Sequence, residues 1–235
     1  SATGAEGTLV ERDTLGEIVS MAFGPNGYLY LMSADSNLCS CLSGAASSGP
    51  YNRLYCYNPT TGAKVFNVKT GYSFVDGDGK APLGNGAFAA GSLGFNAVAA
   101  SCNYAYTMNG AKLDRWNLTT GAHFNQITVT GGNASPNNIN SGIVTDKCGN
   151  VYVGSLNNIY VYDPALTLIG TIAGLPGEVV DLAWGSNSQL FACGGVSSGA
   201  SFLTSVAVPT CTTTASGVTV TPTQPGGCGG TGSAT

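Results

Sequence analysis

The chain has 235 residues, of which 9% are charged, and its formal net charge is −4. This small acidic excess provides no basic surface for nucleic acid, whose binding depends on neutralising phosphates. No apolar run reaches the roughly 18 residues of a membrane-spanning helix, so we expect no membrane insertion. Because the chain contains 35 glycines and glycine disfavours helix, we expect an all-β protein with almost no helix.

A short strand that runs into a turn recurs along the chain. The copies are Tyr55–Ala63, Arg115–Ala122 and Tyr160–Ala165, and Ser1–Ala5 matches the end of a further copy. Recurrence at a spacing near the roughly 40 to 50 residues of a propeller blade is typical of repeat architectures. The chain is therefore predicted to be modular.

The rest of each module can be read by aligning the copies. Each strand and turn follows two apolar runs joined by a tight turn, at 18–32, 96–108, 141–153 and 179–192. An alternating strand follows the turn at 64–69, 123–129 and 166–172. Short β-rich runs bounded by Asn, Gly and Pro indicate antiparallel strands. Each unit is therefore predicted to be a four-stranded antiparallel blade, and a radial array of such blades is a β-propeller.

The number of blades is about four. Three whole units cover 14–70, 93–130 and 139–173, and a fourth, from 178 to 208, lacks a convincing outer strand. Residues 7–14 follow the opening Thr-Gly turn, where an outer strand belongs, so the N-terminal strand could complete the last blade and hide its edge. The alternative is an open arc that forms part of a larger propeller.

The composition changes after the last blade. Residues 1–209 form the predicted propeller, and residues 210–235 are rich in Thr, Gly and Pro. Such a composition is typical of an extended linker. Residues 217–222 alternate like a strand, so we expect the linker to lead into a further β module.

The eight cysteines are predicted to form disulfides. They are scattered, and Cys39 and Cys41 are spaced too closely for a zinc knuckle. Disulfides place a protein outside a reducing cytoplasm. The connectivity stays open, but pairs to test first join Cys102 with Cys148 and Cys39 or Cys41 with Cys56. The remaining candidates are Cys193, Cys211 and Cys228.

The sequence gives little support for catalysis. His123 is the single histidine, and it alternates with Phe124 and Gln126 on a predicted outer strand, which favours a surface or half-buried position. No Gly-x-Ser-x-Gly turn is present to carry a nucleophile. A polysaccharide-cleaving enzyme would need two facing carboxylates, and the carboxylates here are dispersed. We therefore expect no enzymatic activity and no catalytic residue.

One loop could hold a cation. Asp76 and Asp78 are alternate carboxylates in a Gly-rich stretch, and such residues can present oxygens to Ca²⁺. Lys80 stands where a third oxygen ligand would be expected, so a plain surface turn explains the same residues. No other cofactor is predicted.

Several aromatic residues recur at equivalent repeat positions. Packing between neighbouring blades requires such a pattern, so we interpret these side chains as core and not as a carbohydrate platform. They are Tyr55, Tyr57, Trp116, Tyr160 and Tyr162.

Two segments carry a resemblance to known proteins. Gly227–Thr235 is similar to the opening of the repeat in the SprB-like gliding-motility adhesins of Bacteroidota, and Asp146–Gly154 is similar to propeller blades of cell-surface proteins of that phylum. The resemblance implies a secreted, type 9-exported surface or filament protein that binds or spaces. It also makes Asp13-Thr14-Leu15 similar to the O-glycosylation motif of that phylum.

These observations lead to one preferred function and two alternatives. We expect an extracellular, non-enzymatic surface or filament module that acts in adhesion, surface assembly or gliding-type motility. Its partners would be other protein modules or surface glycans, within a larger polypeptide or assembly. The alternatives are a glycan- or protein-binding propeller that uses its mouth or the insertions at 33–52 and 71–95, and a propeller enzyme acting on polysaccharide.

Overall fold

Alternating apolar and polar residues produce strands throughout the described chain. The computed structural model describes residues 18–33, 53–70, 97–109, 112–130, 142–185, 189–195 and 201–208. Within these ranges the chain forms 15 strands and no helix, so none of the described segments is a helix that could span a membrane. Three sheets have four strands each and one has three, and every sheet is an antiparallel meander in chain order. We call these sheets blades 1 to 4.

The strand bounds follow the predicted units. Blade 1 contains β1 (Ile18–Phe23), β2 (Leu29–Ser33), β3 (Arg53–Tyr57) and β4 (Lys64–Lys69). Blade 2 contains β5 (Ala97–Ala100), β6 (Tyr104–Asn109), β7 (Lys112–Asn117) and β8 (His123–Thr128). Blade 3 contains β9 (Ile143–Thr145), β10 (Val151–Ser155), β11 (Asn158–Tyr162) and β12 (Leu168–Ile172). Blade 4 contains β13 (Glu178–Trp184), β14 (Gln189–Gly195) and β15 (Ser201–Ala207).

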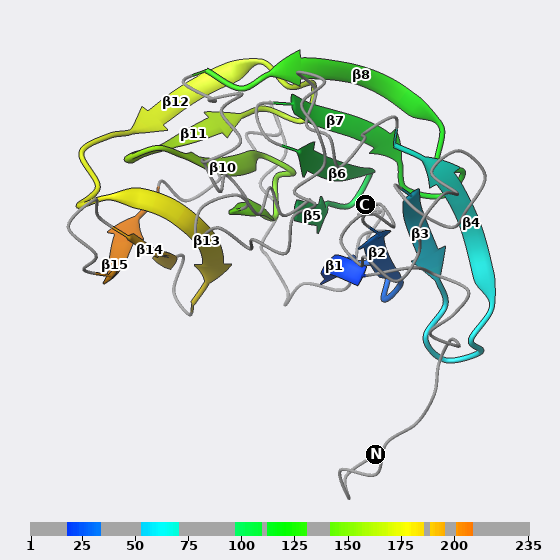
Figure 1. The fold of residues 1–235 in the computed structure, drawn as a ribbon. Coiled ribbons are helices and arrows are strands. Elements are labelled where there is room, and N and C mark those ends of the chain that lie inside the picture. The colour runs from blue at the N-terminus through cyan, green and yellow to red at the C-terminus, as the bar shows by residue number, and fades with distance from the viewer. Residues whose placement is uncertain are drawn as a thin grey trace, which may run out of the picture.

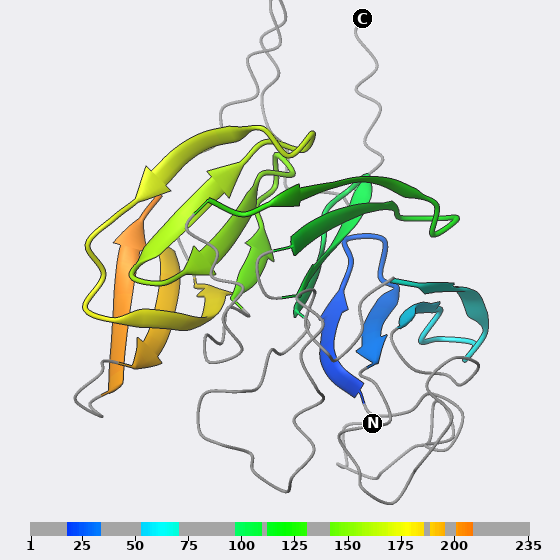
Figure 2. The same ribbon diagram turned by 45° about the horizontal axis from the view of Figure 1, so that its top comes forward.

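The blades lie side by side around a common axis (Figure 1). The inner strands contact each other in the order β1, β5, β9 and β13, while β4, β8 and β12 form the outer rim (Figures 1 and 2). No comparable contact joins the described parts of blade 4 and blade 1. The arrangement is a four-blade β-propeller, as predicted, and its described part is an arc that is open between its two end blades.

The outer turns confirm that the blades are equivalent. Asn58 Oδ1 accepts hydrogen bonds from the amides of Thr60 and Thr61 at 2.9 and 3.3 Å. Asn117 Oδ1 accepts the matching pair from the next two Thr amides at 2.9 and 2.8 Å. Asp163 Oδ1 likewise accepts from the amides of Ala165 and Thr167 at 2.9 and 2.8 Å. Such Asx turns stabilise the reversal that starts an outer strand.

The backbone of these turns requires a left-handed residue. Gly62 and Gly121 adopt φ values of 71° and 72°, which glycine tolerates without steric cost. Leu166 takes the corresponding place in the shorter third turn, with φ of 70°. A register shift precedes each turn at the same point of β3, β7 and β11, so even the irregularities repeat.

The hydrophobic core lies between the blades. We call the surface of a blade that points to the next blade in chain order its far face, and the opposite surface its near face. Three clusters of buried residues fill the junctions between blades 1 and 2, 2 and 3, and 3 and 4. Trp116, Tyr160 and Tyr162 lie in these clusters, which confirms their prediction as core residues. Tyr55 and Tyr57 are also buried, in a separate cluster on the near face of blade 1.

Tyrosines on the second strands connect neighbouring blades. The Tyr30 hydroxyl donates to the carbonyl of Leu118 at 3.0 Å, and the Tyr106 hydroxyl donates to the carbonyl of Pro164 at 3.3 Å. Both acceptors follow directly after the Asx residue of the next blade. The same hydrogen bond therefore recurs at two junctions. Burial of Tyr106 in its junction also raises the pKa of its hydroxyl to about 12.

Candidate functional site

The inner strands of all four blades line one pocket. It has a volume of about 480 Å³, which is within the usual range for ligand sites. Strand β1 contributes Ser20 to Phe23, β5 contributes Val98 to Ala100, β9 contributes Ile143 to Thr145, and β13 contributes Asp181, Leu182 and Trp184.

Hydrogen bonds between blades hold the pocket wall together. The Val98 amide donates to Ser20 Oγ at 3.1 Å, and Thr145 Oγ1 donates to the carbonyl of Ala100 at 2.9 Å. Trp184 Nε1 donates to the carbonyl of Thr145 at 2.8 Å. Each junction between inner strands thus has one such bond, so the wall is a connected surface.

The side chains that line the pocket are mostly apolar, but the surface that the pocket exposes is mostly polar. Asp181 is its single ionisable lining residue, and its carboxylate accepts a hydrogen bond from the Leu182 amide at 2.8 Å. Met21 and Phe23 are exposed at its edge, and Trp184 is half-buried. This wall offers both polar and apolar contacts to a ligand, but its lining residues include no pair of groups that could act as acid and base.

The far face of blade 4 is exposed at a position that is buried elsewhere. One third-strand residue of each blade pairs with the residue four positions after the carbonyl that closes the first turn of that blade. These four equivalent residues are Leu54, Leu113, Ile159 and Leu203. The first three are 0% exposed, because the next blade covers them. Leu203 is 73% exposed. Blade 4 therefore presents, to solvent, a residue that the repeat places in a junction.

The near face of blade 1 shows the complementary feature. Met21 is three residues before the first turn of its blade, and its equivalents are Val98, Ile143 and Leu182. Those three are 5%, 6% and 4% exposed, whereas Met21 is 69% exposed. Phe23, two residues later, is 68% exposed. The inner part of this face is consequently open, while its outer part is filled by the cluster around Tyr55 and Tyr57.

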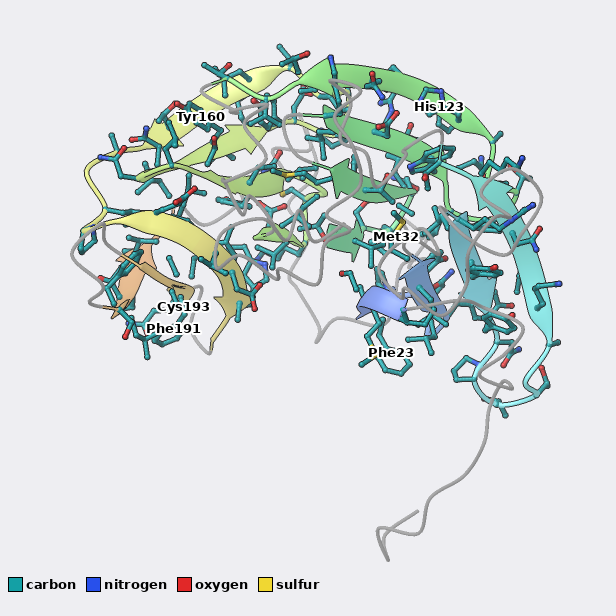
Figure 3. The ribbon with its side chains drawn as sticks, in the orientation of Figure 1. Phe23, Met32, His123, Tyr160, Phe191 and Cys193 are labelled. Atoms are coloured by element: carbon teal, nitrogen blue, oxygen red, sulfur yellow. The ribbon has the colours of Figure 1, made fainter. Side chains whose placement is uncertain are left out.

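Two further residues of the blade 4 far face are labelled in Figure 3. Phe191 occupies the position of Tyr30 and Tyr106, and Cys193 occupies that of Met32, as the strand pairing shows. Both are half-buried. A row of apolar side chains thus crosses the exposed face from β14 to β15.

Blade 4 has three strands among the described residues, and its third strand ends without the residue that supports an outer turn. Ala207 pairs with Gln189 as Asn117 pairs with Tyr104 in blade 2, so Ala207 stands at the Asx position. An alanine side chain cannot accept the hydrogen bonds that stabilise the outer turn. The described part of blade 4 ends with three strands, as predicted, and the outer edge of β15 has no strand partner among the described residues.

His123 lies away from the pocket, on the outer rim (Figure 3). Its Nε2 is 2.6 Å from Asp114 Oδ1, and the two side chains are 44% and 1% exposed. Gln126 Nε2 donates to both oxygens of Asp114 at 3.1 and 3.0 Å. The prediction that His123 has a surface or half-buried position on an outer strand is confirmed, because it is exposed on β8. The group is a satisfied buried carboxylate, which stabilises β7 against β8.

The cysteines divide into two groups. Cys102 and Cys148 are disulfide-bonded, and their turns are neighbours, because a Cβ placed on Gly149 would lie 3.7 Å from Ser101 Cβ. Their bonding to each other stays a prediction. Cys56 and Cys193 are free, so the prediction of disulfides at these two positions is wrong for this structure.

The reason for the free Cys56 is its burial in the junction between blades 1 and 2. Burial raises the pKa of its thiol to about 11, and a neutral buried thiol behaves as a small apolar side chain. Cys39, Cys41, Cys211 and Cys228 lie outside the described residues, as do Asp76 and Asp78 of the predicted calcium site. Within the described ranges no group of three metal-ligating side chains is present.

Sequence reasoning did not single out the exposed end faces. Met21, Phe23 and Leu203 belong to ordinary alternating strands, and their exposure depends on which blades follow or precede them. The signal that could have found them is the alignment of repeats. It places each of them in register with core residues of the other blades.

Comparison with known proteins identifies the fold. No family model and no curated protein matches the sequence. A structure of U3-55K matches with a TM-score of 0.52 and 13% identity over 82% of this chain and 53% of that chain. The RRP9 WD40 repeats match with 0.52 and 12% over 82% and 52%, and a chain of the mitotic checkpoint complex with 0.55 and 12% over 88% and 56%.

These likenesses establish a WD40-like β-propeller. At 12 to 13% identity they concern the fold alone. The chain spans just over half the length of each of these structures. Its blades therefore correspond in extent to part of a WD40-type propeller.

Proposed function

We propose that the chain is a non-enzymatic, extracellular scaffold that assembles with other protein through the exposed faces of its end blades. β-Propellers are usually protein-binding scaffolds. The observation that carries the proposal is the contrast between Leu203, 73% exposed, and its buried equivalents in the other three blades. Exposed apolar surface of this kind marks protein interaction sites.

The extracellular placement rests on cysteine chemistry. Cys102 and Cys148 are disulfide-bonded, and disulfides persist in oxidising compartments. The resemblance of Gly227–Thr235 to repeats of surface adhesins points the same way. Within this setting the scaffold would serve adhesion, surface assembly or gliding-type motility.

The absence of catalysis is part of the proposal. His123 is bonded to a buried carboxylate on the outer rim, and the pocket wall supplies Asp181 as its one ionisable group. A hydrolytic mechanism needs at least two groups that exchange protons with a substrate or with water. We expect no turnover of polysaccharides.

Protease treatment of intact cells tests the placement. We expect the chain to be cleaved before lysis, and its Cys102 and Cys148 to react with maleimide only after reduction. Purified chain is incubated in parallel with a panel of polysaccharides. Protection from protease until lysis, or release of reducing sugar, contradicts the proposal.

Glycan recognition by the pocket is the second candidate. Phe23 and Trp184 provide aromatic surface beside the Asp181 carboxylate, and aromatic rings with a few polar groups suit sugar binding. A glycan array with the wild-type chain and with Asp181→Asn tests it. Signals that depend on Asp181 support this second function, and a blank array removes it.

A further inference from the structure

The far face and outer edge of blade 4 resemble one side of a junction between two blades. Its row of Phe191, Cys193 and Leu203 matches the rows that blades 1 to 3 bury against the next blade. Strand β15 has the position of β3, β7 and β11, which pair with an outer strand in the other blades. An unpaired edge strand readily accepts another strand. The face is therefore suited to packing against another blade, and the edge is suited to pairing with another strand.

The near face of blade 1 resembles the other side of a junction, which the near faces of blades 2 to 4 form within the chain. Ile18 is equivalent to Val179, because each is six residues before the first turn and precedes the same register shift. Val179 is 0% exposed and Ile18 is 39% exposed. Together with Met21 and Phe23, Ile18 forms an apolar strip along the inner strand that no described blade covers.

We propose that blade 4 of one chain docks blade 1 of a second copy, and that two copies close one propeller ring with two identical junctions. This inference rests on the proposed function and names the partner. The two end faces are the two halves of the interface that already recurs three times within the chain. The solved propellers that the chain matches are about twice the length it covers, so an arc of similar extent completes such a ring.

The junction between blades 3 and 4 indicates which residues meet. Val179 packs on Gly154 so closely that a Cβ at Gly154 would lie 2.5 Å from Val179 Cγ1. Their equivalents at the proposed junction are Ile18 of one copy and Cys193 of the other. In blade 2 the position equivalent to Gly154 holds Met108. A junction can therefore accommodate a side chain at this position, as the proposed junction must for Cys193.

Light scattering on the purified chain tests the association. The wild-type chain is expected at twice the mass of a single chain. Leu203→Glu and Phe23→Glu, which place charges on the two halves of the junction, are each expected at the single mass with unchanged circular dichroism. Ile169→Glu is the matched control, because Ile169 is an exposed apolar residue of β12 outside both end faces, and it is expected to leave the pair intact.

A cysteine at position 18 identifies the contact. Two differently tagged Ile18→Cys chains are mixed and oxidised with copper phenanthroline, and we expect a disulfide between position 18 of one tag and Cys193 of the other. Leu168→Cys, on β12, is expected to give none.

A single-chain mass at every concentration, as closure by the chain's own N-terminus would give, overturns the proposal. A pair that survives both charge substitutions, or a ladder of larger assemblies, also overturns it. These outcomes leave the cell-surface placement untouched, since that is tested by protease on intact cells.

Discussion

Blades 1 to 3 and blade 4 share the same first three strands and differ in the residue at which the third strand ends. In the first three blades an Asn or Asp accepts two backbone hydrogen bonds at the outer turn, and an outer strand comes next. In blade 4 alanine stands at that position. The three inner strands of a blade therefore form through pairing and junction packing, whereas the outer strand also depends on the chemistry of one turn.

The second difference between these regions is burial. Equivalent apolar side chains are fully buried at the junctions inside the arc and exposed at its ends. The stability of the propeller therefore comes from contacts between blades. The same substitution should lower the free energy of unfolding more at a junction inside the arc than on an exposed end face.

Leu113→Ala is expected to have the largest effect. Leu113 is 0% exposed, and truncation of a buried Leu costs about 2–5 kcal/mol. Its equivalent Leu203→Ala should change the free energy of unfolding by no more than about 0.5 kcal/mol. Both are measured by urea unfolding in the Phe23→Glu background, which removes association. Equal losses at the two positions would contradict the account.

Alkaline pH is expected to have the second-largest effect, because it destabilises the junctions between blades. Burial raises the pKa of Tyr106 and Tyr152 from 10.0 to about 12, so the unfolded chain ionises first. Stability is full below about pH 10 and falls as the pH rises toward 12, by about 1.4 kcal/mol for each unit of raised pKa. Tyr106→Phe should flatten this fall in urea unfolding measured against pH. A curve unchanged by the substitution would exclude Tyr106 as a cause.

Gly121→Ala should come third. Gly121 has φ of 72°, and a Cβ there would lie 2.7 Å from the Phe66 ring. Backbone strain of about 1–3 kcal/mol is then joined by a clash with blade 1. Gly27→Ala is the matched control, because Gly27 has φ of 77° but open space around it. Thermal unfolding should show the larger loss for Gly121, and the reverse order would refute the contact between the turn and blade 1.

Asn117→Ala is expected to have the smallest effect. It removes the acceptor of two turn hydrogen bonds, each worth about 0.5–1.5 kcal/mol. Asn117→Asp keeps the acceptor, as Asp163 does in blade 3, and should be close to wild type. Urea unfolding of the two variants tests the turn, and an equal loss for Asp and Ala would mean that the acceptor is not what matters.

The sequence was sufficient to predict the blades because local patterns determine them. Alternation specified the strands, and the recurring Asn-x-Thr-Thr-Gly turn specified their order. The three strands predicted for residues 178–208 are confirmed, and the turn signal is absent at Ala207. The interpretation of Trp116, Tyr160 and Tyr162 as junction residues also follows from repeat position.

Other features depend on contacts between blades that local patterns do not encode. A Cys on a strand can form a disulfide or pack in a core. Cys56 packs in the core between blades 1 and 2 as a free thiol. The exposure of Met21 and Leu203 depends on which blades adjoin them. Their apolar character gave no sign of this, because the same residue types are buried elsewhere in the arc.

The central claim is that the end faces of the arc are junction surfaces that no described blade covers. Thiol labelling at the four equivalent positions tests it directly, with Leu54→Cys, Leu113→Cys, Ile159→Cys and Leu203→Cys each made in the Phe23→Glu background and read by peptide mass. The account predicts rapid labelling at position 203 and protection at positions 54, 113 and 159. Equal labelling at all four positions, or protection at 203 alone, would contradict it.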